Sequence, residues 1–292
     1  KNRFIVSIFF SIKSYSSFFF VSFLYEILNF FLDNNKLLGN LYLMIETDLS
    51  LYLIIFCTAL IAGFIDSIAG GGGLIVTPVL LLLGLPPLNA LATNKLQAVF
   101  GTSTASLNYR NNLPKNNSNL ISLFIVSFLS SIAGTIFITK IDSDLLLKVI
   151  PFLLIALAIF FALKKDLESL DRKELMSANM YIFIILLIGF YDGAIGPGTG
   201  TFFMIAFVSL KGMNLLTANY NTKVLNFASN LGSLIIFIYL DLVNITFGLI
   251  MGAGQVLGAY LGSNLTLLKG SKIIKPTLVS VSLLMSIRIL IT

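Results

Sequence analysis

Residues 62–73 read AGFIDSIAGGGG, an apolar stretch that contains one aspartate, Asp66, and ends in four consecutive glycines. Apolar residues lie on both sides of this run, over residues 49–68 and again over residues 73–85. Because glycine lacks the side chain that restrains the backbone, the run predicts a break between two helices. The second helix, at about a dozen residues or ~18 Å, is too short to cross a bilayer. We therefore expect a broken span with an acidic residue beside the break.

The composition around this motif is that of a membrane protein. The 292-residue chain is 57% hydrophobic and only 11% charged, whereas soluble domains carry about 25% charged residues. Its mean hydropathy is +0.96. It has no histidine and one cysteine, which argues against disulfides, thiolate metal sites and imidazole catalysis. We predict an all-α integral membrane protein with no catalytic residue, no metal and no cofactor.

Apolar runs between polar breaks predict ten helical segments. The segments cover residues 49–68, 73–85, 95–109, 119–139, 144–163, 178–194, 200–211, 223–240, 243–262 and 273–291. The runs that follow the two glycine-rich stretches are too short to span alone, so we expect them to be half-helices.

The basic residues predict an orientation, because Lys and Arg are retained on the cytoplasmic side of a membrane. With Glu46 and Asp48 outside, ten basic residues face the cytoplasm and three face outside. The ten are Arg110, Lys115, Lys164, Lys165, Arg172, Lys173, Lys211, Lys269, Lys272 and Lys275, and the three are Lys140, Lys148 and Arg288. They form no basic face, so the net charge of +6 does not indicate nucleic acid. We expect a multi-pass protein of the cell inner membrane.

The motif recurs in the second half of the chain. GFID at residues 63–66 returns as GFYD at residues 189–192, an offset of 126. At that offset Gly70 and Gly72 fall on Gly196 and Gly198, and after two inserted residues Gly84 and Asn94-Lys95 fall on Gly212 and Thr222-Lys223 at an offset of 128. Five predicted spans separate each feature from its copy. An odd number turns the second copy over, so we predict two inverted repeats of about five spans each, with glycine-broken half-helices.

This repeat divides the chain into residues 44–163, residues 178–292 and a cytoplasmic linker at residues 164–177. Residues 1–43 stand apart. They are either an extra helix that starts inside or an upstream artefact attached to a protein that begins at Met44, and we favour the second interpretation. No predicted site residue lies in them.

Each half places a glycine break, a short helix and a polar patch in the same order. The N-termini of the short helices direct unpaired N–H groups and positive dipole ends toward the break, which favours an anion. Lysine adds cationic charge, and Asn, Gln and Thr add hydrogen bonds. The predicted substrate-binding residues are Lys95, Lys223, Asn94, Gln97, Thr222, Asn226, Gly72, Gly73, Gly198 and Thr199.

The charged residues of these motifs have alternative roles. Asp66 and Asp192 could carry a coupling ion, or could pair with lysine or cap the backbone turn. Lys95 and Lys223, predicted near helix starts, could contact substrate or reach the membrane surface. Elsewhere, Gly254, Gly258 and Gly262 are spaced by four and predict close helix packing. The glycine run is not followed by the Gly-Lys-Ser/Thr of a phosphate loop.

The motif at residues 62–73, with GLPP at residues 84–87 and TNKLQ at residues 93–97, resembles the sulfite exporter TauE/SafE family of membrane permeases. The second half, with Asp192, GPGTG at residues 196–200 and NTK at residues 221–223, resembles that family's second copy. The resemblance covers residues 49–292. It implies an inner-membrane transporter of sulfite, sulfonates or related organosulfur anions.

The leading function is a secondary transporter of small anions, with export favoured because an inside-negative potential drives anions outward. The alternative is a membrane assembly or sensor protein that retains the transporter fold without transporting. A membrane enzyme is disfavoured because the chain lacks histidine and paired cysteines. The expected partners are a small anionic substrate and the lipid bilayer, with no nucleic acid, and a homo-oligomer is left open.

Overall fold

The computed structural model describes residues 48–113, 120–146, 148–150, 152, 177–270 and 272–273. Residues 52–292 form one compact unit, to which the following description applies. The predicted extension at residues 1–43, nearly all of the linker at residues 164–177 and nearly all of the span at residues 273–291 lie outside the described residues. So does most of the span at residues 144–163.

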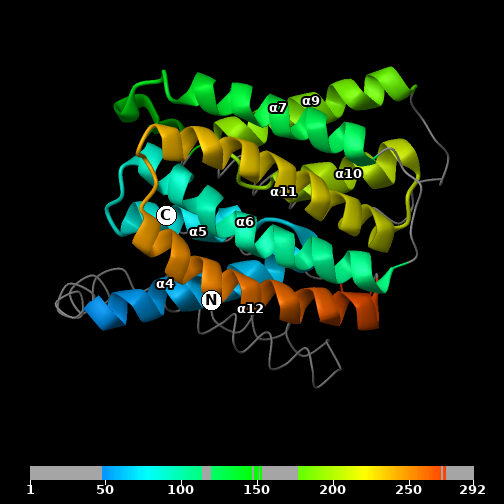
Figure 1. Cartoon of the computed structure of the whole chain (residues 1–292), viewed down its shortest axis with the longest axis horizontal. Helices are drawn as coiled ribbons and strands as arrows, with labels where there is room; N and C mark the ends of the chain where they lie inside the picture. The colour runs from blue at the N-terminus through cyan, green and yellow to red at the C-terminus, as the bar shows by residue number, and fades with distance from the viewer. Residues whose placement is uncertain are drawn as a thin grey trace, which may run out of the picture. The chain divides into compact units, whose positions relative to one another are not determined.

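The described part of the chain is helical and contains no strand (Figure 1). The helices are α4 (Asp48–Ala69), α5 (Gly72–Leu82), α6 (Pro87–Asn112), α7 (Leu120–Ile138), α9 (Ala178–Ala194), α10 (Thr199–Lys211), α11 (Leu215–Tyr239) and α12 (Ile245–Lys269). Four of them, α4, α7, α11 and α12, are long and apolar enough to cross a membrane. Within the described residues, the prediction of an all-α protein is confirmed, and four helices have the length and composition that a membrane span needs.

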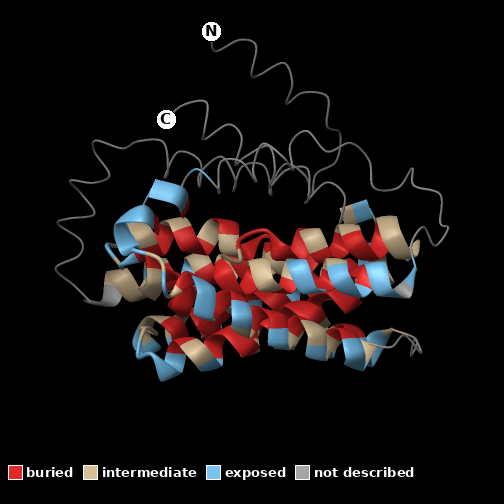
Figure 2. Cartoon of the chain, turned by 90° about the horizontal axis from the view of Figure 1, so that it is seen from above, coloured by how far each residue is buried: buried red, intermediate tan, exposed pale blue. Residues whose placement is uncertain are grey.

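Apolar side chains lie on the outside of the protein, as expected for contact with lipid, and many polar side chains lie in its interior. Large apolar residues such as Ile121, Phe183 and Leu249 are exposed on the outer faces of the helices, whereas many Ser, Thr, Asn and Lys side chains are buried between them. Figure 2 shows buried residues concentrated on the faces where helices meet. Since a soluble protein places these classes the other way round, the pattern agrees with the composition.

Helices α4, α6 and α12 run parallel to one another. Leu96 of α6 packs on Gly248 of α12, and further along Asn108 donates a hydrogen bond to Ser263. On the other side of α12, Gly254, Gly258 and Gly262 lie against successive backbone turns of α4, where any larger side chain would overlap the chain. The prediction that these glycines serve close helix packing is confirmed.

Helices α7, α9 and α11 form a second parallel set. Ser127 and Ser131 of α7 face Gly189 and Gly193 of α9. On its other side, Ser127 Oγ donates to the Leu225 carbonyl of α11 at 3.1 Å. The two sets meet where α6 packs against α11. There Tyr109, late in α6, contacts Asn219, early in α11, so these helices are antiparallel.

The short helices α5 and α10 begin where the glycine breaks predict. Their N-cap residues, Gly71 and Gly198, have left-handed φ angles of 100° and 83°. This pairing corrects the predicted match of Gly198 with Gly72, which is the first residue of α5 and has no left-handed φ. One of the two inserted residues, Pro197, therefore lies inside the second glycine break.

Helices α6 and α11 begin earlier than the predicted segments at residues 95–109 and 223–240. Each starts eight residues before its lysine, at Pro87 and Leu215. A proline at the first helical position and the Asn214 side chain, which accepts from the Thr217 N–H at 2.9 Å, mark the two starts. Lys95 and Lys223 therefore lie two turns inside their helices. The apolar pattern misses these turns because buried polar residues form them.

Candidate functional site

The two glycine breaks meet in the interior. A side chain at Gly70 would lie 2.7 Å from the Thr201 nitrogen, and one at Gly200 would lie 3.0 Å from the Gly70 Cα. The break after α4 thus lies directly against the start of α10. Glycine is required at this crossing because the two backbones leave no room for a Cβ, and Gly70 also has a left-handed φ of 87°.

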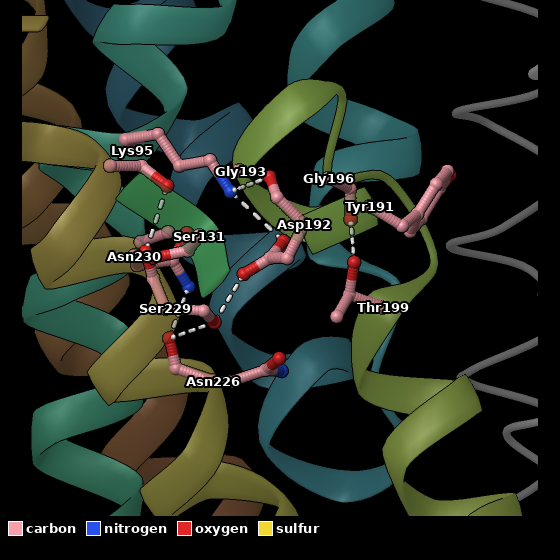
Figure 3. A network of polar contacts seen from close by, with 12 residues as sticks. Lys95, Ser131, Tyr191, Asp192, Gly193, Gly196, Thr199, Asn226, Ser229 and Asn230 are labelled. Atoms are coloured by element: carbon pink, nitrogen blue, oxygen red, sulfur yellow. Dashed lines mark hydrogen bonds and ion pairs between the residues drawn. The ribbon is translucent and has the colours of Figure 1, made fainter. Parts of the chain in front are cut away.

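Lys95, from α6, pairs with the aspartate of the other half. Its Nζ lies 2.9 Å from Asp192 Oδ1 and donates to the Asp192 carbonyl at 2.5 Å. The second carboxylate oxygen of Asp192 accepts a hydrogen bond from Ser229 of α11. The side chains of Lys95 and Asp192 are 1% and 3% exposed. Figure 3 shows Lys95, Asp192 and Ser229 in one connected network.

Lys223, from α11, makes the reciprocal pair with the first half. Its Nζ lies 3.1 Å from Asp66 Oδ2 and also donates to the Asp66 carbonyl. The other oxygen, Oδ1, accepts from the Gly72 N–H at 3.1 Å. Lys223 is fully buried, whereas the Asp66 side chain is 17% exposed. Each lysine therefore binds the aspartate that precedes the glycine break of the opposite half.

These crossed pairs bear on the alternatives left open by the sequence. Both aspartates pair with lysine, and Asp66 in addition caps the first N–H of α5. Neither lysine reaches the surface, since both are at most 1% exposed. A buried charge without a partner is strongly destabilising, so the pairs hold the two halves together as long as the carboxylates stay charged.

A small polar cavity of about 30 Å³ lies between the two glycine breaks. That volume holds one or two water molecules. Nine of the twelve predicted site residues line it, namely Asp66, Gly72, Gly73, Asn94, Gln97, Asp192, Gly198, Thr199 and Asn226. The other three are Lys95, Lys223 and Thr222, which are buried and do not line the cavity. The structure thus brings together residues that lie up to about 160 positions apart in the sequence.

Several N–H groups around the cavity have no hydrogen-bond partner within the described part of the chain. They include the backbone N–H groups of Gly73 and Gly200, each the second residue of its short helix. The side-chain amides of Asn94 and Asn226 also donate to no described residue. Because these residues line the cavity and the groups have no partner among the described residues, they are available to water or to a ligand.

Some lining residues were not predicted from the sequence. Thr102 and Asn230 lie one to two turns beyond the predicted polar patches, on the same faces of α6 and α11. Each lies seven residues after the lysine of its helix, which is two helical turns, so the helical period predicts that they share its face. Gln255 of α12 also lines the cavity, although only the glycines of this helix were singled out in the sequence. Its signal is that it is a lone polar residue within a segment of glycine and apolar residues.

Comparison with known proteins identifies one matching family and several relatives that are named as probable membrane transporters. The sulfite exporter TauE/SafE family matches residues 55–289. A probable membrane transporter protein, ORF9, of a Sinorhizobium species is 44% identical over 83% of this chain and 94% of its own length. Probable membrane transporter proteins of Haemophilus influenzae and Escherichia coli (YfcA) are each 40% identical, over 82% and 81% of this chain and 95% and 88% of theirs. No solved structure matches the chain.

Proposed function

The chain belongs to the sulfite exporter TauE/SafE family, and we propose that it is a secondary transporter that exports small anions such as sulfite, sulfonates or related organosulfur compounds. The family and the relatives' names support a membrane transporter rather than an enzyme. The substrate class is our inference from the family's description and from the chemistry of the cavity.

The observation that carries the proposal is the set of unpaired N–H donors between the two short helices. The N–H groups of Gly73 and Gly200 lie at positive helix ends, where an anion is favoured. The amides of Asn94 and Asn226 supply side-chain donors beside them. A small oxyanion offers several acceptor oxygens to such donors, whereas a cation would face the same positive helix ends.

Lys95 and Lys223 lie behind the aspartates and supply positive charge from there. In this conformation their ammonium groups are occupied by Asp192 and Asp66. We propose that an incoming anion competes with a carboxylate for its lysine, and that Asp66 is the carboxylate displaced. Both lysines are at most 1% exposed and each is held by a carboxylate, so an anion would reach a lysine only if that carboxylate moves.

We further propose that the two halves are inverted repeats that rock against each other. The helices α4 and α9, which contain the matching aspartates, belong to the two antiparallel sets. This opposition, the two short helices and the crossed pairs support alternating access to a site at the repeat interface. An inside-negative potential drives a monoanion outward by about 2.3 kcal/mol per 100 mV, so export needs no ATP.

The direct test is flux of radiolabelled sulfite in vesicles of defined lipid that contain the purified full chain. We expect saturable flux, stimulated by a membrane potential that is positive on the receiving side, and competition by unlabelled methanesulfonate. Vesicles with an Asn94→Leu, Asn226→Leu variant should show a raised KM. Absence of saturable flux with sulfite, thiosulfate and methanesulfonate would contradict the proposal and favour a sensor or assembly role.

A further inference from the structure

Gln255 of α12 is a buried polar side chain that neither ion pair uses. It is 3% exposed and lines the cavity. Its amide makes no hydrogen bond with any described residue, as donor or as acceptor. Because the amide lines the cavity and has no partner there among the described residues, its hydrogen-bonding groups are open to water or to a ligand.

Two glycines make room for this side chain. Gly101 of α6 lies against the end of the Gln255 side chain, and a Cβ there would overlap Gln255 Oε1 and lie 3.2 Å from its Cδ. Gly63 of α4 lies against both its amide oxygen and its backbone, where an added Cβ would be 2.6 Å from Gln255 Oε1 and 2.8 Å from the Gln255 carbonyl. The position is therefore shaped to hold a long amide that extends toward the cavity.

The first half of the chain has no equivalent amide. Ser127 of α7 lies against Gly189 as Gln255 lies against Gly63, so Ser127 is its counterpart. Ser127 donates its hydroxyl to the Leu225 carbonyl and does not line the cavity. Gln255 thus supplies an amide from the set of helices α4, α6 and α12 that the set of α7, α9 and α11 does not supply from the matching position.

We infer that Gln255 is a substrate ligand that donates its amide N–H to an oxygen of the transported oxyanion. This assignment rests on the proposed function, since it takes the cavity as the anion site. Gln255 is the ligand that comes from outside the repeated glycine and lysine motifs. Its neutral amide adds a donor without adding charge, so it raises affinity for the oxyanion group without altering the charge balance of the two ion pairs.

The test is KM and maximal rate for radiolabelled sulfite in proteoliposomes containing wild type, Gln255→Leu or Gln255→Glu. Losing a hydrogen bond to an anion should raise KM about 10- to 100-fold in Gln255→Leu. The maximal rate per inserted molecule should stay within about twofold, because binding rather than turnover is affected. Gln255→Glu should raise KM further, because its carboxylate repels the anion.

A second variant tests the same contact without touching Gln255. Gly101→Ser should push the amide away from the cavity and raise KM to a similar degree, and adding Gln255→Leu to it should cause little further rise. The control is Ser263→Ala, on the same helix, fully buried and outside the cavity, which should leave KM unchanged.

The outcomes separate the two proposals. A wild type without saturable flux of sulfite, thiosulfate or methanesulfonate overturns the proposed function. A wild type that transports sulfite, with KM unchanged in Gln255→Leu, overturns only the assignment of Gln255. A loss of inserted protein with unchanged KM in both Gln255 variants assigns the residue to packing and also overturns it.

Discussion

The two ion pairs come from the same repeated motif but are held differently. Asp192 is closed off, since Lys95 and Ser229 bind its two oxygens and its side chain is 3% exposed. Asp66 is bound by Lys223 and by the Gly72 N–H, and its side chain is 17% exposed. At the position that matches Ser229 the first half has Gly101, which offers no hydroxyl.

Matching charges in a repeated sequence motif can therefore lie in different surroundings and have different roles. The second-half pair is the more enclosed of the two, because the Asp192 side chain is 3% exposed and is bound by side chains of α6 and α11. Both aspartates line the cavity, but the Asp66 side chain is 17% exposed, so we propose that Asp66 is the one that exchanges its partner for a ligand or for water. We therefore expect changes at Asp192 to affect folding, and changes at Asp66 to affect transport.

The largest effect should come from breaking the closed pair. Lys95→Gln leaves Asp192 charged and buried without its cation, which costs about 3–5 kcal/mol. Lys95→Gln with Asp192→Asn should recover most of that loss, because no unpaired charge remains. Thermal unfolding in detergent measures both. Lys223→Gln should cost less, since Asp66 can hydrate in the cavity, and equal losses at the two lysines would contradict the comparison.

A smaller effect is expected from Gly196→Ala beside the closed pair. Gly196 has a φ of 93°, and an added Cβ would lie 2.9 Å from Lys95 Nζ and 3.0 Å from Asp192 Oδ1. The left-handed backbone alone costs an L residue about 1–2 kcal/mol. Gly84→Ala is the matched control, because Gly84 has a φ of 84° and open space around it. Unfolding temperatures should fall further for Gly196→Ala, and an equal fall would show that the pair tolerates the added methyl group.

The smallest of the three effects should follow Ser229→Ala. Removing the hydroxyl that donates to Asp192 should destabilise the protein by about 1–3 kcal/mol, the cost of an unsatisfied buried charged acceptor. Ser233→Ala is the control, because Ser233 is equally buried on α11 but donates only to the Ser229 carbonyl. The two variants should differ in unfolding temperature while both retain sulfite KM. An altered KM in Ser229→Ala alone would mean that Asp192 also takes part in binding.

Much of the fold and part of the site follow from local sequence signals. The glycine run, the recurrence of GFID as GFYD and the short apolar runs predict the breaks and the half-helices, because glycine and hydropathy act locally. The same signals place Gly73, Asn94 and Asn226 near one site. The starts of α6 and α11 were misplaced because a hydropathy pattern cannot distinguish a buried polar turn from a loop.

Other features depend on tertiary structure. The crossing of Lys95 to Asp192 and of Lys223 to Asp66 could not be predicted, since pairing within each half satisfies the same charges. The role of Gln255 depends on helix α12 packing against glycines of α4 and α6, far away in sequence. Their charge and hydrogen-bonding capacity distinguish the two lysines and Gln255 from the apolar residues around them in the sequence. Which groups they contact depends on the arrangement of the helices.

The central claim is that a small oxyanion binds in the cavity between the two glycine breaks. Selenite is a heavier analogue of sulfite, and its anomalous scattering locates it in a crystal of the full-length protein. We predict a peak between Gly73 and Gly200, within hydrogen-bond distance of their N–H groups and of the Asn226 amide. A selenite peak elsewhere in the helical bundle, with this cavity holding only water, would contradict the account.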